Sequence, residues 1–141
     1  ATANKLLAAA KGEFFHFLMS DDTVLTENYN TLIDQLYSFC GDIVAMDLLV
    51  NNGDVWHLDE EKDMAWCAQA CRFIRRSLVD GIKYPEKVKA GEDWFFHQEI
   101  RKRNPKVEYS GVVAYRYNFP REGSLMNLRA RGLIADEDLS P

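Results

Sequence analysis

Hydrophobic positions along this chain follow two spacings. Apolar residues repeat as on one face of a helix in several segments, which predict helices at 2–11, 26–39, 92–103 and 123–133. Short, nearly continuous apolar or aromatic runs predict strands at 13–19, 42–50, 72–75, 106–109 and 112–117. Because helices and strands alternate without an internal repeat, we expect an α/β layered fold in a single domain, 1–141.

Some segments carry further local signals. The run 42–50 is apolar at almost every position, which predicts a strand buried on both faces. The segment 55–58 follows a Gly-containing turn and is predicted to pair back as a hairpin. Thr26 is placed to cap the helix that follows it. Residues 60–79 are ambiguous, and their pattern fits a helix followed by the short strand.

The composition and charge of the chain exclude some classes of protein. With 141 residues, of which 47% are hydrophobic, the chain is long enough to bury a core of its own. A net charge of −5 argues against a general nucleic-acid binder, and no apolar run reaches the about 20 residues of a membrane span. Neither a signal peptide nor metal-ligand spacing of the three cysteines is evident, so we expect reduced thiols and a cytoplasmic protein.

The strand at 13–19 runs into two adjacent carboxylates, Asp21 and Asp22. Such a pair is common in a solvated turn. It also follows a strand, where ligands bind in α/β sheets, and paired carboxylates suit a hard cation such as Mg²⁺ or Mn²⁺ that also contacts substrate phosphates. The motif therefore has a structural interpretation and a metal-binding one.

A second acidic pair, Glu92 and Asp93, opens the helix at 92–103. These residues can act as a cap and first-turn acids, unrelated to chemistry. Alternatively, a carboxylate held ionised at a helix N-terminus can accept a proton from a sugar hydroxyl. Neither alternative is excluded by the motif alone.

The order of the motifs resembles the second half of a family-2 glycosyltransferase of the GT-A fold, which is a mixed sheet flanked by helices. The resemblance spans about Asn4 to Asn127 and rests on three stretches: ANKLLAAAKGEFFHFLMSDD, YPEKVKAGEDWFFHQEI and VVAYRYNFPREGS. In the first stretch the matching positions are Asn4, Ala10, Gly12, Phe17, Asp21 and Asp22.

The resemblance implies a site for sugar transfer. Asp22, with Asp21 beside it, would hold Mn²⁺ or Mg²⁺ on the diphosphate of a nucleotide sugar, with UDP the expected nucleotide. Asp93 would remove the proton from the acceptor hydroxyl in a single displacement that inverts the anomeric centre, with Glu92 as its neighbour. Trp94 would offer an apolar face to an acceptor sugar.

The resemblance also implies that a loop closes over the donor diphosphate. Arg116, Arg121 and Ser124 are the candidates for this contact, although Arg116 could equally be an exposed strand residue. The chain departs from the family pattern at Met19, where many relatives have an aspartate, and at Ala3, where an arginine is frequent.

The largest departure is that the family's N-terminal βαβ nucleotide-binding region has no counterpart before Asn4. The resemblance implies that this half lies on a longer or separate chain, and that activity needs it. We therefore expect the strand 13–19 to have an edge covered by another element or chain. Two functions stay open: a metal-assisted glycosyltransferase, represented by its metal-binding and acceptor-side half, and a non-catalytic α/β interaction module derived from one.

Overall fold

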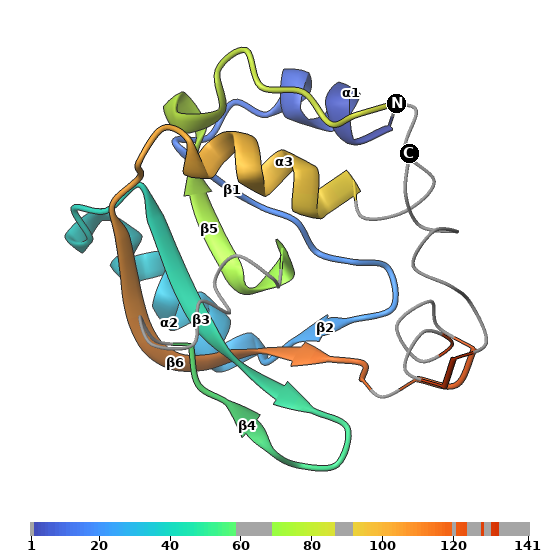
Figure 1. Ribbon diagram of the computed structural model, residues 1–141. Coiled ribbons are helices and arrows are strands. Elements are labelled where there is room, and N and C mark those ends of the chain that lie inside the picture. Colours follow the sequence, from blue (N-terminus) through green and yellow to red (C-terminus); the bar gives the residue numbers. More distant parts are fainter. Residues whose placement is uncertain are drawn as a thin grey trace.

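The computed structural model describes residues 2–58, 69–86, 92–119, 121–123, 128 and 131–132. These residues form a curled mixed sheet with helices on both sides (Figure 1). The helices are α1 (Thr2–Ala9), α2 (Thr26–Gln35) and α3 (Glu92–Arg101). The strands are β1 (Phe14–His16), β2 (Thr23–Val24), β3 (Ile43–Val50), β4 (Val55–Trp56), β5 (Arg72–Arg75) and β6 (Val107–Tyr117). The predicted α/β class is confirmed.

Strand β3 is the centre of the sheet. The strand order is β1-β5-β3-β6-β2, and β4 also pairs with β3. The β3–β6 pair is parallel and the other pairs are antiparallel. All of β3 except Leu49 is buried, including Asp47, as its nearly continuous apolar run predicts. Strands β4, β5 and β6 therefore pair with β3 directly, and β1 and β2 are joined to it through one neighbouring strand.

The helices cover the sheet in two groups. Helices α1 and α3 pack together on one side, and α2 lies on the other (Figure 1). Phe96 and Ile100 of α3 pack in a cluster with Ile43 and Ile74 of the sheet. Leu32 of α2 packs in the second cluster. The amphipathic spacing seen in the sequence is thus used to bury one face of each of these two helices.

Strand β6 differs from the sequence prediction, which placed two strands at 106–109 and 112–117. The structure has one continuous strand, because Gly111 takes φ of 67° and lets the chain continue through an irregularity. Tyr109 and Val113 of β6 face Ala45 and Asp47 of β3, so β6 holds extra residues there. This bulge sets the register of the C-terminal half of β6.

Helix α2 corrects a second prediction. Thr26 is the first helical residue and not the cap; the N-cap position is Leu25, whose side chain makes no capping hydrogen bond. The strand at 13–19 is also shorter than predicted, since only Phe14–His16 is regular. The predicted helix at 123–133 and the helical part of 60–79 fall largely outside the described residues.

Strand β1 lies at the end of the sheet, and among the described strands it pairs with β5 alone. The N–H of Arg76 donates to the carbonyl of Glu13 (2.7 Å), and antiparallel pairs alternate in bonding. The backbone groups of Phe14 and His16 therefore face away from β5. A groove of about 350 Å³ runs beside this edge, between β1 and α2.

Candidate active site

The carboxylate of Asp22 joins two distant parts of the chain. It lies in the turn before β2, where it is 8% exposed. The hydroxyl of Tyr115 donates to Oδ2 (2.7 Å), and the backbone N–H of Asn118 donates to Oδ1 (2.8 Å). Burial, followed by the hydrogen bond and negative charge of Asp22, raises the pKa of Tyr115, which stays a neutral donor. Asp22 is thus firmly positioned by the end of β6.

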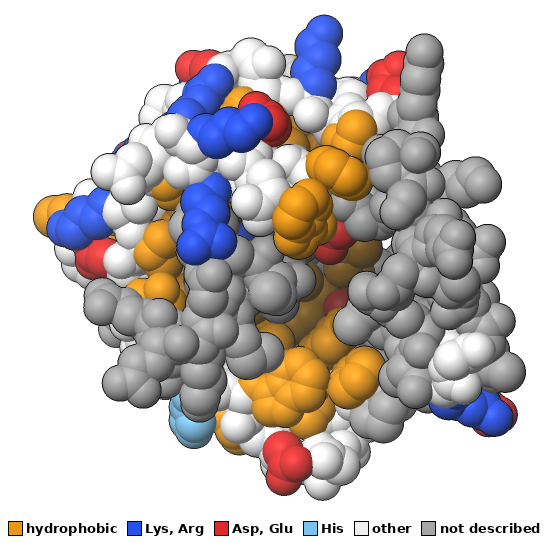
Figure 2. Space-filling view, viewed as in Figure 1, with side chains coloured by type: hydrophobic (Ala, Val, Ile, Leu, Met, Phe, Trp, Pro, Cys, Tyr) orange, Lys and Arg blue, Asp and Glu red, His pale blue; other side chains and the backbone are white. Residues whose placement is uncertain are grey.

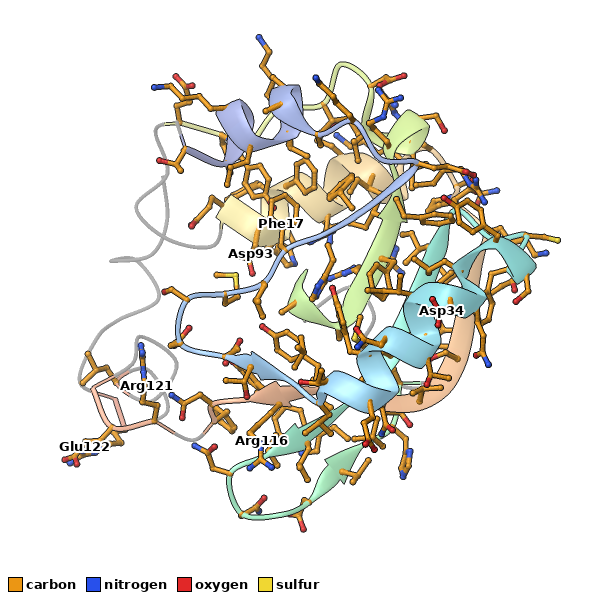
Figure 3. The ribbon with its side chains drawn as sticks, turned by 180° about the vertical axis from the view of Figure 1, so that it is seen from behind. Phe17, Asp34, Asp93, Arg116, Arg121 and Glu122 are labelled. Carbon is orange, nitrogen blue, oxygen red and sulfur yellow. The ribbon has the colours of Figure 1, made fainter. Side chains whose placement is uncertain are left out.

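Asp21 is the more accessible carboxylate of the pair. Its Oδ2 atom lies 2.7 Å from Nη1 of Arg121, with side chains 36% and 47% exposed respectively. An ion pair this exposed adds little stability, about 0–1 kcal/mol. It does place a cationic side chain next to the aspartates, and Figure 3 shows Arg121 beyond the end of β6.

The two aspartates suit a cation that the substrate helps to bind. Each carboxylate oxygen has two acceptor sites, so the donors from Tyr115 and Asn118 leave Asp22 able to accept further bonds. No group of three or more His, Cys, Asp or Glu side chains suited to a metal occurs among the described residues. The donor set therefore fits Mg²⁺ or Mn²⁺ that keeps waters and binds substrate phosphates, and not an all-protein cage.

Glu92 and Asp93 form the first turn of α3, as predicted. Oδ1 of Asp93 accepts the backbone N–H of Trp94 (2.8 Å), while Glu92 is exposed. The positive end of the helix dipole favours an ionised carboxylate at this position. Figure 3 shows Asp93 at the start of α3, beside the chain that leads out of β1.

Both acidic motifs act electrostatically on one side chain, Tyr117 of β6. Burial raises the pKa of the Tyr117 phenol, and the negative charges of Asp22, Asp21 and Asp93 raise it further. Since such effects weaken with distance, both motifs lie on the side of the sheet that Tyr117 faces. Figure 2 shows a hollow in this face between the start of α3 and the ends of β4 and β6. Hydrophobic side chains line it and acidic side chains lie inside it.

The half of α3 that follows Asp93 packs against the buried side chain of Tyr84. Tyr84 stacks on Phe96 with ring centroids 4.1 Å apart. Burial raises the pKa of Tyr84, as do the charges of Asp93 and Glu92, whereas the charge of buried Arg72 lowers it. The Tyr84 phenol thus lies between the carboxylates at the start of α3 and the buried positive charge of Arg72.

The remaining predicted residues are placed differently. Arg116 is exposed, and because side chains alternate along a strand it points to the face opposite Tyr115 and Tyr117, away from Asp93 (Figure 3). Trp94 is 51% exposed and packs edge-on against Phe95, next to Asp93. Ser124 lies outside the described residues.

Sequence reasoning missed the residues that hold the aspartates. Tyr115 in β6 and Asn118 directly after it hold Asp22 from positions that are remote from it in sequence. A tyrosine-rich strand was the only signal. The sequence predicts only that this strand leads into the loop over the diphosphate, and the structure adds that Tyr115 of the strand binds Asp22.

No protein-family model matches the chain, and no curated protein matches it in sequence. Among solved structures, S. aureus TarS 1–349 superposes with a TM-score of 0.67 at 21% identity, over 83% of this chain and 39% of TarS. The complex of S. aureus TarS 1–349 with UDP-GlcNAc superposes with a TM-score of 0.69 at 22% identity, over 88% of this chain and 39% of TarS. The chain has a glycosyltransferase-like fold.

This glycosyltransferase-like fold extends over less than half of the matched structure. The complex of S. aureus TarS 1–349 with UDP gives a TM-score of 0.66 at 21% identity, over 82% of this chain and 38% of that one. The chain therefore spans about two fifths of the TarS 1–349 structures. None of the helices in the described ranges has the length and apolar character needed to cross a bilayer.

Removing the donor to Asp22 is expected to destabilise the fold. Tyr115→Phe deletes the hydroxyl and leaves the buried carboxylate short of one partner, which costs about 1–3 kcal/mol of unfolding free energy. Urea denaturation measures it. Tyr37→Phe is the control, because Tyr37 is 78% exposed. Equal stability of both variants would show that the Tyr115 contact contributes nothing.

Stability is expected to fall in acid because of His97. This residue of α3 is 1% exposed, and burial, with the charge of Arg72, lowers its pKa to about 2. The unfolded state has the ordinary pKa, about 6.5, so the unfolded state binds the proton first as the pH falls. The contribution of His97 is complete above pH 6.5, and about 2 kcal/mol is lost by pH 5.

The variant His97→Leu tests this expectation. It should lose less unfolding free energy between pH 7.5 and pH 5 than the parent protein, by about 2 kcal/mol. The comparison at pH 7.5 is the control, because His97 is neutral in both states there. Parallel stability curves for the two proteins would contradict the assignment of the acid sensitivity to His97.

Proposed function

We propose that the chain is the metal-binding and acceptor-side part of an inverting glycosyltransferase. The enzyme would move a sugar from a nucleotide-diphosphate donor, a UDP-sugar, to an acceptor hydroxyl. The observation that carries the proposal is geometric: in a glycosyltransferase-like fold, Asp22 is held at the end of β6 and Asp93 lies at the start of α3, and a hollow with acidic side chains inside it separates these two ends. TarS, solved with UDP and with UDP-GlcNAc, supports a nucleotide-sugar partner.

Asp93 serves as the general base. As the acceptor oxygen bonds to the anomeric carbon, the proton of the hydroxyl passes to the Asp93 carboxylate and the bond to the diphosphate breaks. The electron pair of that bond leaves with UDP. One displacement from the face opposite the leaving group inverts the centre. Glu92 adds negative charge beside the base, and Trp94, half exposed at the same helix start, is available to the acceptor.

Asp21 and Asp22 are the residues that would hold Mn²⁺ or Mg²⁺ beside the donor diphosphate. When bound, such an ion neutralises the charge that develops on the departing nucleotide. Asp22 is fixed by Tyr115 and Asn118, so it contributes a preorganised carboxylate. Arg121 forms an exposed ion pair with Asp21, and such a pair adds little stability in water. Arg121 can therefore exchange the Asp21 carboxylate for an oxygen of the diphosphate.

The nucleotide-binding region is supplied from outside this stretch, on a longer or a separate chain. Its proposed place is the edge of β1 that pairs with no other strand of the described residues, where backbone donors and acceptors and the adjoining groove are available to another strand. Transfer is therefore best assayed with the 141 residues joined to such a region, and UDP is expected to bind the chain alone weakly.

The base is tested with Asp93→Asn. The amide keeps the size and capping ability of the side chain but accepts no proton at neutral pH. Turnover is expected to fall by about 10²–10⁴ with an almost unchanged melting temperature. Glu99→Gln is the control, since Glu99 lies on the exposed side of the same helix. Full transfer by Asp93→Asn would show that the acidic pair at 92–93 is structural and that Asp93 is not the base.

The metal ligands are tested by calorimetry of UDP binding with and without Mn²⁺. The protein measured is the 141 residues joined to the nucleotide-binding region. Its binding of UDP is expected to require the ion. Asp21→Asn is expected to weaken the binding of UDP at least about tenfold, since one of two anionic ligands is lost. Asp34→Asn is the control because it removes the same charge from the exposed side of α2 (Figure 3). UDP binding that is equally tight without a divalent ion would refute the assignment.

A further inference from the structure

An aromatic cluster stands at the edge of the hollow, where β4 and β6 end. Its members are Trp56, Tyr117 and Phe119, called here the aromatic platform. The Tyr117 and Phe119 rings are stacked, with centroids 5.6 Å apart and planes within 6°. Trp56 lies 5.5 Å from Phe119 and 6.1 Å from Tyr117. All three side chains are half-buried, unlike the fully buried core aromatics Tyr115 and Phe96.

The platform is held rigidly on its β6 side. The N–H of Asn118, between the two stacked residues, donates to Asp22. The backbone N–H of Asn51 donates to the carbonyl of Phe119 (3.0 Å), and the Asn51 amide donates to Oδ1 of Asn118 (2.8 Å). The rings are thus fixed in advance, which lowers the entropy lost on binding.

The β4 side is fixed equally well. Trp56 faces Leu48 in the β3–β4 pair. The next two residues are bound by the buried carboxylate of Asp47: Nδ1 of His57 lies 2.7 Å from Oδ2, and the N–H of Leu58 donates to Oδ1 (2.9 Å). Trp56 is therefore anchored by its own pairing with β3 and by the two residues that follow it.

The platform is continuous with the candidate active site. Tyr117 is a member of the platform, and its phenol experiences the charges of Asp22, Asp21 and Asp93, together with the opposing charge of Arg121. Figure 2 shows hydrophobic side chains forming the wall of the hollow over β4 and the end of β6, with acidic side chains deeper inside. A ligand on the platform would have one side on aromatic rings and its edge toward carboxylates.

We propose that the aromatic platform binds the pyranose ring of a sugar substrate by stacking. A pyranose has an apolar face of C–H groups and a rim of hydroxyls. The C–H face suits the electron-rich face of an aromatic ring, and the hydroxyls suit the carboxylates and amides at its border. This inference rests on the proposed function, and it assigns Trp56, Tyr117 and Phe119 to sugar recognition.

The ring could belong to the acceptor or to the donor, so the experiment has two arms. Saturation-transfer NMR is recorded with chitotriose as the free saccharide, and with UDP-GlcNAc compared with UDP. Transfer to the protons of one C–H face of the ring is expected in at least one arm. A signal from chitotriose assigns the platform to the acceptor, and a signal confined to the sugar of UDP-GlcNAc assigns it to the donor.

Substitutions locate the binding. Trp56→Ala is expected to weaken the sugar contact about 2- to 10-fold, the usual worth of an aromatic contact, and Trp56→Phe to retain most of it. Tyr37→Ala removes an exposed aromatic residue from the side of the sheet that carries α2, and it is expected to leave the saturation-transfer signals of the sugar unchanged. Loss in Trp56→Ala with recovery in Trp56→Phe excludes a general folding defect.

The outcomes separate this inference from the proposed function. No ring signal in either arm, or signals unaffected by Trp56→Ala, overturns the platform even if Asp93-dependent transfer is measured. Conversely, sugar binding that depends on Trp56 supports the platform even if transfer proves independent of Asp93.

Discussion

The interaction between the Asp22 carboxylate and the end of β6 underlies the whole candidate site. Strand β2 pairs with β6 through only two residues, Thr23 and Val24, so strand pairing alone would hold this corner weakly. A buried carboxylate requires hydrogen-bond partners, and Tyr115 and Asn118 supply them. The same contacts fix the turn that carries both aspartates and the chain that carries the aromatic platform.

The opposite wall of the hollow has a different kind of support. There α3 is held by apolar packing, with Phe96 stacked on Tyr84 and Ile100 buried in the same cluster. Asp93 is thereby placed by a rigid helix, and Asp22 by a hydrogen-bonded turn. Catalytic groups held on such elements keep their geometry better than groups on free loops. The site is therefore assembled from two sides, each fixed independently against β3 and its neighbours.

The main elements were predictable because their patterns are strong. The nearly continuous apolar run of β3 and the amphipathic, dipole-matched sequence of α3 both predicted the observed element. The continuity of β6 was not predictable, since Gly111 is equally typical of a turn and of a bulge. Asp22 shows the same limit for the site: adjacent aspartates indicate a ligand or a turn, and only tertiary contacts reveal the bonds to Tyr115 and Asn118.

The parallel pairing of β3 with β6 has a consequence for folding. Between these two strands the chain passes through β4, β5 and α3, so their contacts are distant in sequence, and distant contacts close slowly. The β3–β4 hairpin and α2 can form earlier from local contacts. The carboxylates and the aromatic rings would come together only when β6 docks. The hollow is thus a late product of folding, and a chain arrested before that step would carry both acidic motifs without a site.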